Sequence, residues 1–229
     1  MKENELELLR RLYRGIFSED ELVDLFQQNR DKYRVLLHLV QQPKFPERLS
    51  LGIIPKLYPM DLIRVVKNKR TNPFVRKRTE QEFANKYPRF PLGEKLSYMK
   101  IIPASMLDYF IEEKDSRVLE VILNNPYCTA DAVLKMINRY TPRYSLYNAL
   151  FTTEWYKRPQ VAEAIAHDDQ APIRILTTII PYLNIRQLEK LYGHPDTHQN
   201  VKNSIITYLQ QRNRKQERGQ EPQQNEGSE

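Results

Sequence analysis

Apolar positions recur along this chain in a pattern of paired short helices. Three segments align without a gap, 35–54, 118–137 and 161–180, and each begins with valine and ends with isoleucine. In the second segment Val118 and Ile122 lie one helical turn apart, and another apolar stripe follows a polar break. The pattern therefore predicts two short α-helices joined by a tight turn in each segment.

The residues at the break are ones that end and start helices. Asn125 precedes Pro126, and a residue before proline avoids the helical region of backbone space. Thr129 is a good N-cap for the next helix, and Pro46 and Pro172 in the other segments suit a first helical turn. The break is therefore expected to be a turn between two helices.

The helix pairs recur at a regular interval. The valines that open the first helix of each pair are Val35, Val75, Val118, Val161 and Val201. Their spacing of 40 to 43 residues is the period of HEAT or armadillo repeats. Between the pairs, a further helix is expected to begin at Pro59, Pro103 and Pro181. Near the start, Ser18 and Glu21 form a capping box that opens another helix.

This pattern predicts an all-α fold, an α-solenoid of about five HEAT-like helical repeats. The alternative is an irregular compact helical bundle in which the periodicity is accidental. We expect one repeat domain over 1–211. The tail 212–229 is rich in Gln, Glu, Arg and Gly and has no apolar residue apart from Pro222, so it is expected to be disordered.

Composition excludes several classes of protein. The chain has 229 residues, 6 glycines and 1 cysteine. One cysteine excludes a disulfide scaffold, and few glycines argue against a Gly-rich phosphate loop. The start lacks the basic and apolar regions of a signal peptide, and the longest apolar stretch, 175–183, is too short to span a membrane. We therefore expect a soluble cytoplasmic protein with no membrane partner.

Positive charge is concentrated in one run. The chain carries 36 Lys and Arg against 29 Asp and Glu, a net charge of +7. No acid interrupts the seven cations of this run, which are Arg64, Lys67, Lys69, Arg70, Arg76, Lys77 and Arg78. The functional interpretation is an anion site on one edge of the repeats, for nucleic-acid phosphates or an acidic partner protein. The alternative is a solvated loop edge near a helix C-terminus.

Aromatic and basic residues alternate in a later stretch. The members of this candidate surface are Tyr140, Arg143, Tyr144, Tyr147, Trp155 and Tyr156. Such a surface binds single-stranded nucleic acid by stacking, or a protein partner through Tyr and Arg anchors. The alternative is that the rings pack between helices with their hydroxyls in solvent.

No constellation of catalytic or metal-binding residues stands out. His194 and His198 have i, i+4 spacing, but Gly193 and Pro195 predict a turn there. Cys128 aligns with apolar positions, so we expect a buried small side chain rather than a nucleophile. We therefore expect no catalytic residue, no metal, no cofactor and no small-molecule substrate, and predict that the chain is not an enzyme.

The turn Asn125-Pro126-Tyr127-Cys128-Thr129, with helices on both sides and a period near 43, resembles HEAT-like repeats and bacterial leucine-rich-repeat variant proteins. The resemblance covers about 18–210. It implies a non-enzymatic scaffold that presents a curved surface to a protein partner. The alternative function, which the basic run favours, is nucleic-acid binding through Arg64–Arg78. One subset with this architecture comprises DNA glycosylases for alkylated bases, which use an Asp beside Trp and Tyr. Trp155-Tyr156 is the similar pair here, and no aspartate is assigned to it.

Overall fold

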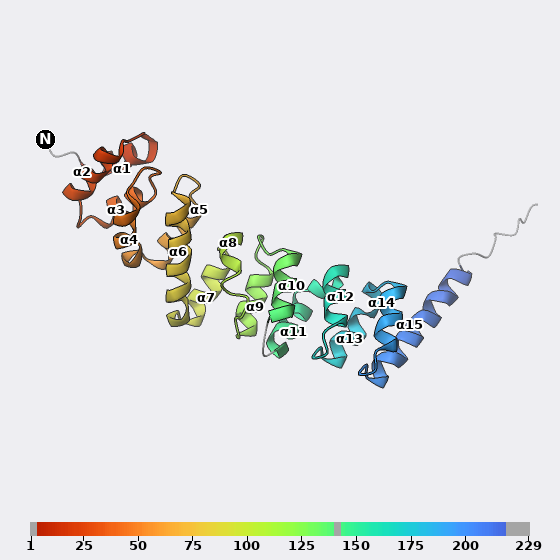
Figure 1. Ribbon diagram of the computed structural model, residues 1–229. Coiled ribbons are helices and arrows are strands. Elements are labelled where there is room, and N and C mark those ends of the chain that lie inside the picture. Colours follow the sequence, from red (N-terminus) through yellow and green to blue (C-terminus); the bar gives the residue numbers. More distant parts are fainter. Residues whose placement is uncertain (1–3, 140–142, 219–229) are drawn as a thin grey trace, which may run out of the picture. The chain divides into compact units, whose positions relative to one another are not determined.

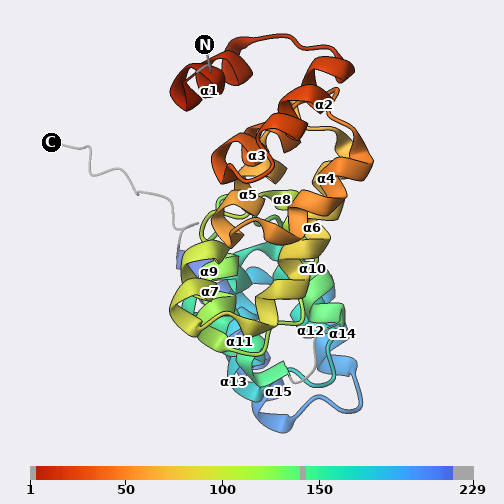
Figure 2. The same ribbon diagram turned by 90° about the vertical axis from the view of Figure 1, so that its left-hand side faces the viewer.

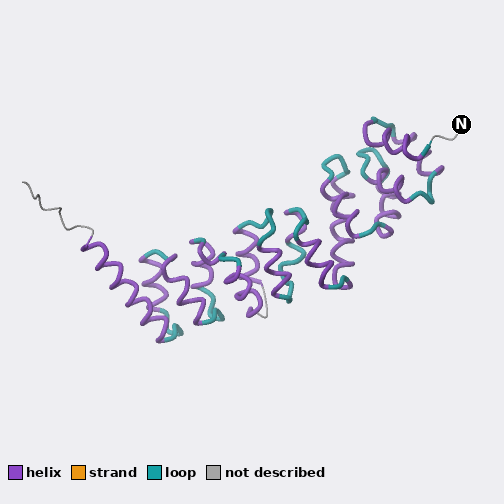
Figure 3. Tube along the Cα trace, turned by 180° about the vertical axis from the view of Figure 1, so that it is seen from behind, coloured by secondary structure: helices purple, strands orange, loops and turns teal. Residues whose placement is uncertain are grey.

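The computed structural model describes residues 4–139 and 143–218. Within these residues every regular element is a helix, and no strand occurs. Short loops join the helices throughout both described stretches (Figure 3). The all-α class predicted from the hydrophobic pattern is therefore confirmed. None of the described helices is long and apolar enough to cross a membrane.

The chain divides into two compact units, unit 1 (Met1–Phe110) and unit 2 (Ile111–Glu229), within the range expected to be one domain. The helices of unit 1 are α1 (Glu5–Arg14), α2 (Glu19–Gln28), α3 (Tyr33–Val40), α4 (Glu47–Ile53), α5 (Pro59–Lys67), α6 (Pro73–Lys86), α7 (Leu92–Met99) and α8 (Ala104–Leu107) (Figure 1). Two 3₁₀ helices, η1 (Ile54–Lys56) and η2 (Tyr87–Arg89), follow α4 and α6. The 14-residue α6 is drawn in yellow in Figure 2 and packs against α5.

The helices of unit 2 are α9 (Ser116–Leu123), α10 (Ala130–Arg139), α11 (Arg143–Thr152), α12 (Pro159–Ala166), α13 (Ile173–Ile179), α14 (Ile185–Gly193) and α15 (Gln199–Arg218). The 3₁₀ helices η3 (Trp155–Lys157) and η4 (Ile180–Tyr182) precede α12 and α14. Helix α15 continues to Arg218, past the boundary expected at 211, because its last turns hold strong helix formers and neither Gly nor Pro. The rest of the expected tail, 219–229, lies outside the described residues.

The two units contain the same sequence of helices, with the same lengths and spacing from α3 to α5 and from α12 to α14. Adding 126 to the residue numbers of α3, α4, η1 and α5 gives the bounds of α12, α13, η4 and α14, and α6 and α15 begin 126 residues apart. We call 33–86 the N-terminal matched segment and 159–212 the C-terminal matched segment. The sequence supports this register, since Ile-Ile-Pro-x-Leu occurs at 53–57 and again at 179–183.

Buried residues one turn apart explain why the first helices of the pairs form. In α3, α9 and α12 the fully buried pairs are Val35 with Leu39, Val118 with Ile122, and Val161 with Ile165. Burying an aliphatic side chain of this size contributes about 1.5–3 kcal/mol. These helices are short, so packing of this stripe rather than helix propensity stabilises them.

The caps predicted at Ser18 and Thr129 and the turn predicted at Asn125-Pro126 are confirmed. The Ser18 hydroxyl accepts from the Glu21 N–H at 3.2 Å, and a Glu21 carboxylate oxygen accepts from the Ser18 N–H at 2.7 Å. Helix α9 ends before Asn125-Pro126, and the Thr129 hydroxyl accepts from the Ala132 N–H at 3.3 Å. Each helix start expected from these local signals is therefore present.

Several prolines sit differently from the expectation. Pro46 and Pro172 are the N-caps of α4 and α13, one residue before the first turn, and their backbone is extended. Pro59 does begin α5, but Pro181 lies inside η4, and α14 begins at Ile185. The true counterpart of Pro181 is Pro55 in η1, so the predicted start at Pro181 was wrong. A capping box formed by Asn184 starts α14 instead.

Candidate anion-binding groove

The loop between α5 and α6 carries most of the predicted basic run. Asn68 ends α5, and its side-chain oxygen accepts from the Arg70 N–H at 3.0 Å, which folds the loop back. Asn72 then caps α6 by accepting from the Phe74 N–H at 2.8 Å, and Pro73 occupies the first helical position. Local sequence therefore determines this tight loop.

Four cations are exposed on the last turn of α5 and in this loop. They are Arg64, Lys67, Lys69 and Arg70, which we call the basic edge. Arg64 pairs with Asp61 at 2.8 Å, although two thirds of its side chain stays in solvent. Arg70 donates to the carbonyls of Tyr13 at 3.1 Å and Gly15 at 3.4 Å, and no described carboxylate pairs with its charge. Lys67 and Lys69 have no acidic partner among the described residues. The basic edge is therefore largely uncompensated.

A groove of about 550 Å³ lies beside the basic edge, between α1, α3 and α5. Tyr13 contributes an exposed aromatic side chain to it, the buried Leu12 and Leu37 lie beneath, and Arg64 and Arg70 contribute charge. The polar lining residues are His38, Gln41, Gln42 and Asn68. This combination accepts a ligand that has both apolar and anionic groups.

The amides of this lining have defined roles. The Gln42 side-chain amide donates to the Leu12 carbonyl at 2.7 Å and so ties α1 to α3. The Asn68 amide donates to the Gln41 side-chain oxygen at 2.9 Å. The Nδ1 of His38 lies 2.8 Å from the Arg34 carbonyl, so Nδ1 carries the proton in the neutral ring. The groove is therefore held in shape by contacts from three helices.

The other three cations of the run, on α6, do not join the basic edge. Consecutive helical residues point in different directions, so Arg76, Lys77 and Arg78 cannot share a face. Arg76 is half-buried. Lys77 lies 5.0 Å from the Tyr109 ring and 3.2 Å from Glu80, and these two side chains, Tyr109 first, raise its pKa. The expectation that all seven cations form one edge was therefore wrong.

Three of the four rings of the predicted aromatic-basic surface that the structure describes are buried. Tyr147, Trp155 and Tyr156 are less than a tenth exposed, which contradicts a stacking platform built from them. Of the candidate rings that the structure describes, Tyr144 is exposed. Tyr140 lies outside the described residues, and the Arg143 side chain is not described. The sequence could not separate these alternatives because a ring on a helix suits both a core and a surface.

Trp155 shows why the buried interpretation holds. Its indole N–H donates to the Leu123 carbonyl at 2.9 Å, and the Arg158 guanidinium lies 3.5 Å from the centre of its ring. Tyr156 stacks on Phe151 with ring centres 5.6 Å apart. These rings join η3 to neighbouring helices of unit 2, so their aromatic faces are occupied.

The remaining candidates, one cysteine and two histidines, do not form a catalytic or metal-binding group among the described residues. Cys128 is half-buried, and burial raises the pKa of its thiol to about 11, which disfavours the nucleophilic thiolate. His194 and His198 lie in the loop between α14 and α15, as the flanking Gly and Pro predicted. Among residues 4–139 and 143–218, no three His, Cys, Asp or Glu side chains are grouped to hold a metal ion.

Sequence reasoning missed the groove and the network beside it. The Tyr33 hydroxyl donates to Asp61 at 2.6 Å and accepts from the Tyr58 N–H at 3.0 Å. Desolvation of the phenol, and then its hydrogen bond to Asp61, raise the pKa of Tyr33 to about 12. These contacts join residues that are 25 and 28 positions apart, so no local sequence pattern predicts them.

Comparison of the chain with known protein families, with curated proteins and with solved structures found no match.

Proposed function

We propose that this chain is a non-enzymatic interaction protein of HEAT-like helical repeats, an α-solenoid, that binds a partner protein through the groove of unit 1. The recurrence of five helical elements after 126 residues supports a repeat protein. Repeat proteins bury an apolar stripe between neighbouring helices and leave other faces for recognition. The proposal includes no catalytic step.

The observation that carries the proposal is the joint lining of the groove. The exposed Tyr13 ring offers apolar contact, and Arg64 and Arg70 offer guanidinium groups beside it. Guanidinium groups bind carboxylates through paired hydrogen bonds. The fitting ligand is a peptide segment with alternating leucine and acidic side chains, in which the acids contact the basic edge.

Nucleic-acid binding is a second candidate, favoured by the unpaired charge of Lys67, Lys69 and Arg70. Four phosphate contacts at the basic edge would give a salt slope of about −4 for duplex DNA. Burial of Trp155 and Tyr156 argues against base stacking, so this candidate rests on backbone contacts alone. The protein partner therefore stands first.

One titration series tests both candidates. Fluorescence anisotropy would follow a labelled peptide of alternating Leu and Glu, and labelled single- and double-stranded oligonucleotides, at two salt concentrations. The variant is Lys67→Glu with Lys69→Glu, because neither side chain makes a contact that the fold needs. The matched control is Lys44→Glu with Lys56→Glu, which changes the net charge equally at other exposed positions of unit 1.

We expect the peptide to bind at both salt concentrations, the loop variant to bind at least tenfold more weakly, and the control to match the unmodified chain. Binding of oligonucleotide alone, with a steep loss in salt and in the loop variant, would favour the second candidate. If neither probe binds, or if both variants weaken binding equally, the groove is not a specific site and the proposal fails.

A further inference from the structure

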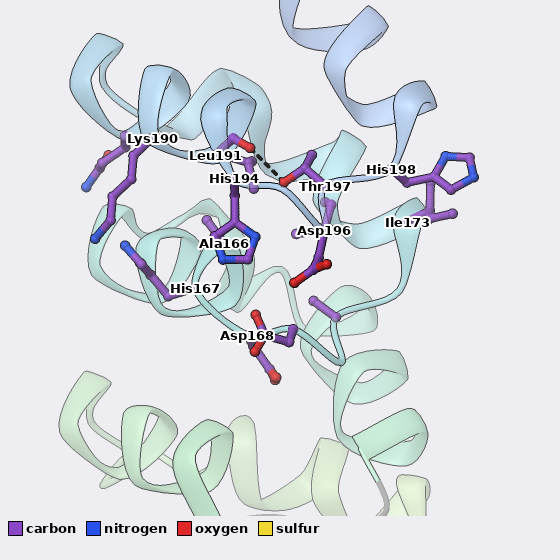
Figure 4. Close-up of a pocket in the computed structure, with 14 residues that line it drawn as sticks. Ala166, His167, Asp168, Ile173, Lys190, Leu191, His194, Asp196, Thr197 and His198 are labelled. Atoms are coloured by element: carbon purple, nitrogen blue, oxygen red, sulfur yellow. Dashed lines mark hydrogen bonds between the residues drawn. The ribbon is translucent and has the colours of Figure 1, made fainter.

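Unit 2 has an open pocket at the edge where unit 1 has its groove, since the positions of His167, Asp168 and Asp196 match those of Gln41, Gln42 and Arg70. The pocket, about 220 Å³ in volume, lies between the α12–α13 turn, α14 and the α14–α15 loop (Figure 4). Ala171 lines it, and the matched position in unit 1 is Phe45, which is 2% exposed and packs against Phe26 with ring centres 6.0 Å apart. Ala166 likewise stands where unit 1 has Val40. Two of the side chains that line the pocket of unit 2 are therefore smaller than those at the matched positions of unit 1.

The pocket has an apolar floor and an acidic rim. Ala171, Leu176 and Leu191 provide apolar surface, and the rim carboxylates are those of Asp168, Asp169 and Asp196. The Lys190 side chain also lines the pocket, so three carboxylates face one ammonium group. Figure 4 shows the carboxylates of Asp168 and Asp196 directed to the same opening, beside the His194 ring. The fitting ligand therefore has an apolar stem and a cationic head.

The two aspartates that matter most are available for a ligand. Asp169 and Asp196 are exposed and make no ion pair or side-chain hydrogen bond within the described residues. Asp168 differs, because it is held by the Tyr147 hydroxyl and accepts from the Gln170 N–H at 3.0 Å. Asp168 therefore shapes the rim, and the other two supply charge that the protein does not neutralise.

The loop that carries Asp196 is also held in place. The Thr197 hydroxyl donates to the Leu191 carbonyl at 2.7 Å, a bond drawn as a dashed line in Figure 4. The matched loop position of Asp196 in unit 1 is Arg70, and that of Asp168 is Gln42. The same edge of the matched segments is thus basic in unit 1 and acidic in unit 2.

We propose that this pocket binds an arginine side chain of a partner protein. The methylene stem would lie on the floor of Ala171, Leu176 and Leu191, and the guanidinium would bind between the carboxylates of Asp169 and Asp196. The volume suits one long side chain rather than a drug-sized ligand, which needs roughly 300–1,000 Å³. The net charge of +7 repels basic peptides from the chain as a whole, so attraction here must be local.

The pocket lies in unit 2 and shares no residue with the groove of unit 1. This proposal is therefore independent of the proposed function, and either one can fail alone.

The test is an NMR titration of the full ¹⁵N-labelled chain with the peptide acetyl-Gly-Arg-Gly-amide and its citrulline twin. Citrulline has nearly the shape of arginine without the charge. We expect the arginine peptide to shift the amides of 166–171 and 193–198 with saturation, and the citrulline peptide to bind at least tenfold more weakly. Equal binding of both peptides, or no shift of these amides, would overturn the proposal.

Two variants separate charge from shape. Asp169→Asn with Asp196→Asn removes charge from the rim, and Ala171→Phe fills the pocket with the residue that unit 1 carries. Each should weaken arginine binding at least tenfold. The control is Asp131→Asn with Glu189→Gln, which removes the same charge from exposed positions of unit 2 outside the pocket and should bind like the unmodified chain.

The outcomes of the variants are decisive in either direction. A folded Ala171→Phe variant that binds arginine as tightly as the unmodified chain contradicts the proposal. If Ala171→Phe does not fold, the aspartate pair decides, since those exposed side chains support no packing. Equal weakening by the aspartate pair and by the control would show general electrostatic attraction and would also reject the pocket.

Discussion

The two matched segments share helix bounds and differ in almost everything that faces outward. Identical residues concentrate at 53–57 and 179–183, where Ile-Ile-Pro-x-Leu forms a 3₁₀ helix between two α-helices. The loops at 67–72 and 193–198 share one residue, Thr71 with Thr197, and carry opposite charges. The comparison teaches that a buried stripe and a proline turn maintain the helix order, while the exposed edge is free to change.

One backbone group shows this difference in detail. The residue before α5 is Tyr58, whose N–H donates to the Tyr33 hydroxyl of another helix. The matched residue before α14 is Asn184, whose N–H donates to the Gln187 side chain at 2.8 Å in a local capping box. The same orphan N–H is satisfied by a tertiary contact in unit 1 and by a neighbour in sequence in unit 2.

The largest expected change in stability comes from a substitution in the core of unit 1. Phe45→Ala converts the residue at this position to the one that unit 2 carries. We expect it to lower the free energy of unfolding by about 3–5 kcal/mol, because it leaves a cavity beside Phe26. Urea unfolding followed by circular dichroism measures the change.

The control for that experiment is Phe74→Ala, the same substitution at a ring that is 45% exposed. Its effect should stay near about 0.5 kcal/mol. If both variants lose the same free energy, Phe45 has no special role in filling the N-terminal matched segment.

The next effect tests the tertiary cap. Tyr33→Phe removes the hydroxyl and leaves the Tyr58 N–H and the buried Asp61 without this partner. We expect a loss of roughly 1–3 kcal/mol in the free energy of unfolding. Denaturant unfolding at neutral pH measures it, and a change below about 0.5 kcal/mol would show that solvent replaces the hydroxyl.

Alkaline pH gives a second readout of the same network. The pKa of Tyr33 is about 12 in the folded chain and near 10 when unfolded, so the native state favours the neutral phenol. The contribution of the Tyr33 phenol to stability is complete below pH 10 and is lost as the pH rises through 12. The Tyr33→Phe variant should lose less stability than the unmodified chain over this pH range. Parallel profiles of unfolding free energy against pH for both proteins would contradict the assignment of this loss to Tyr33.

A smaller effect tests the local cap of unit 2. Asn184→Ala removes the side chain that accepts from the Gln187 N–H at 2.9 Å. We expect a loss of about 1 kcal/mol, as for other N-caps. Thermal unfolding measures it, and replacement by Ser should retain most of the stability. A loss greater than that of Tyr33→Phe would reverse the ranking of the two caps.

The smallest effect concerns the attachment of α1. Arg70→Ala removes two hydrogen bonds to the carbonyls of Tyr13 and Gly15. Both bonds are exposed, so we expect less than about 1 kcal/mol in global stability. Hydrogen exchange in α1 should nevertheless accelerate, while exchange in α3 stays unchanged. Unchanged exchange in α1 would show that the Arg70 hydrogen bonds do not hold this helix.

Local signals predicted the helices well because they act within a few residues. The valine stripes of α3, α9 and α12, the Ser18 capping box and the Asn-Pro break all depend on neighbours one turn away. The start at Pro181 failed because proline suits both a first α-helical turn and a 3₁₀ helix. Pro55 lies as far from Val35 as Pro181 lies from Val161, and this comparison assigns Pro181 to a 3₁₀ helix.

The candidate site was predicted only in part. The charge of the basic edge is visible in the sequence, and so is the loop that presents it. The groove beside it needs Leu12 from a helix some 50 residues earlier than Arg64, and no spacing rule connects them. Burial of Trp155 likewise depends on a carbonyl 32 positions away.

The sequence by itself determined the helical class, the caps, the turns and the place of the positive charge, because each arises from residues that are close along the chain. Tertiary structure alone decided which rings are buried, which cations remain unpaired and where pockets open. These properties depend on side chains that meet only after folding, such as Tyr33 with Asp61. The size of a pocket also depends on the side chain at each position: Ala171 lines the pocket of unit 2, whereas the matched Phe45 is buried against Phe26.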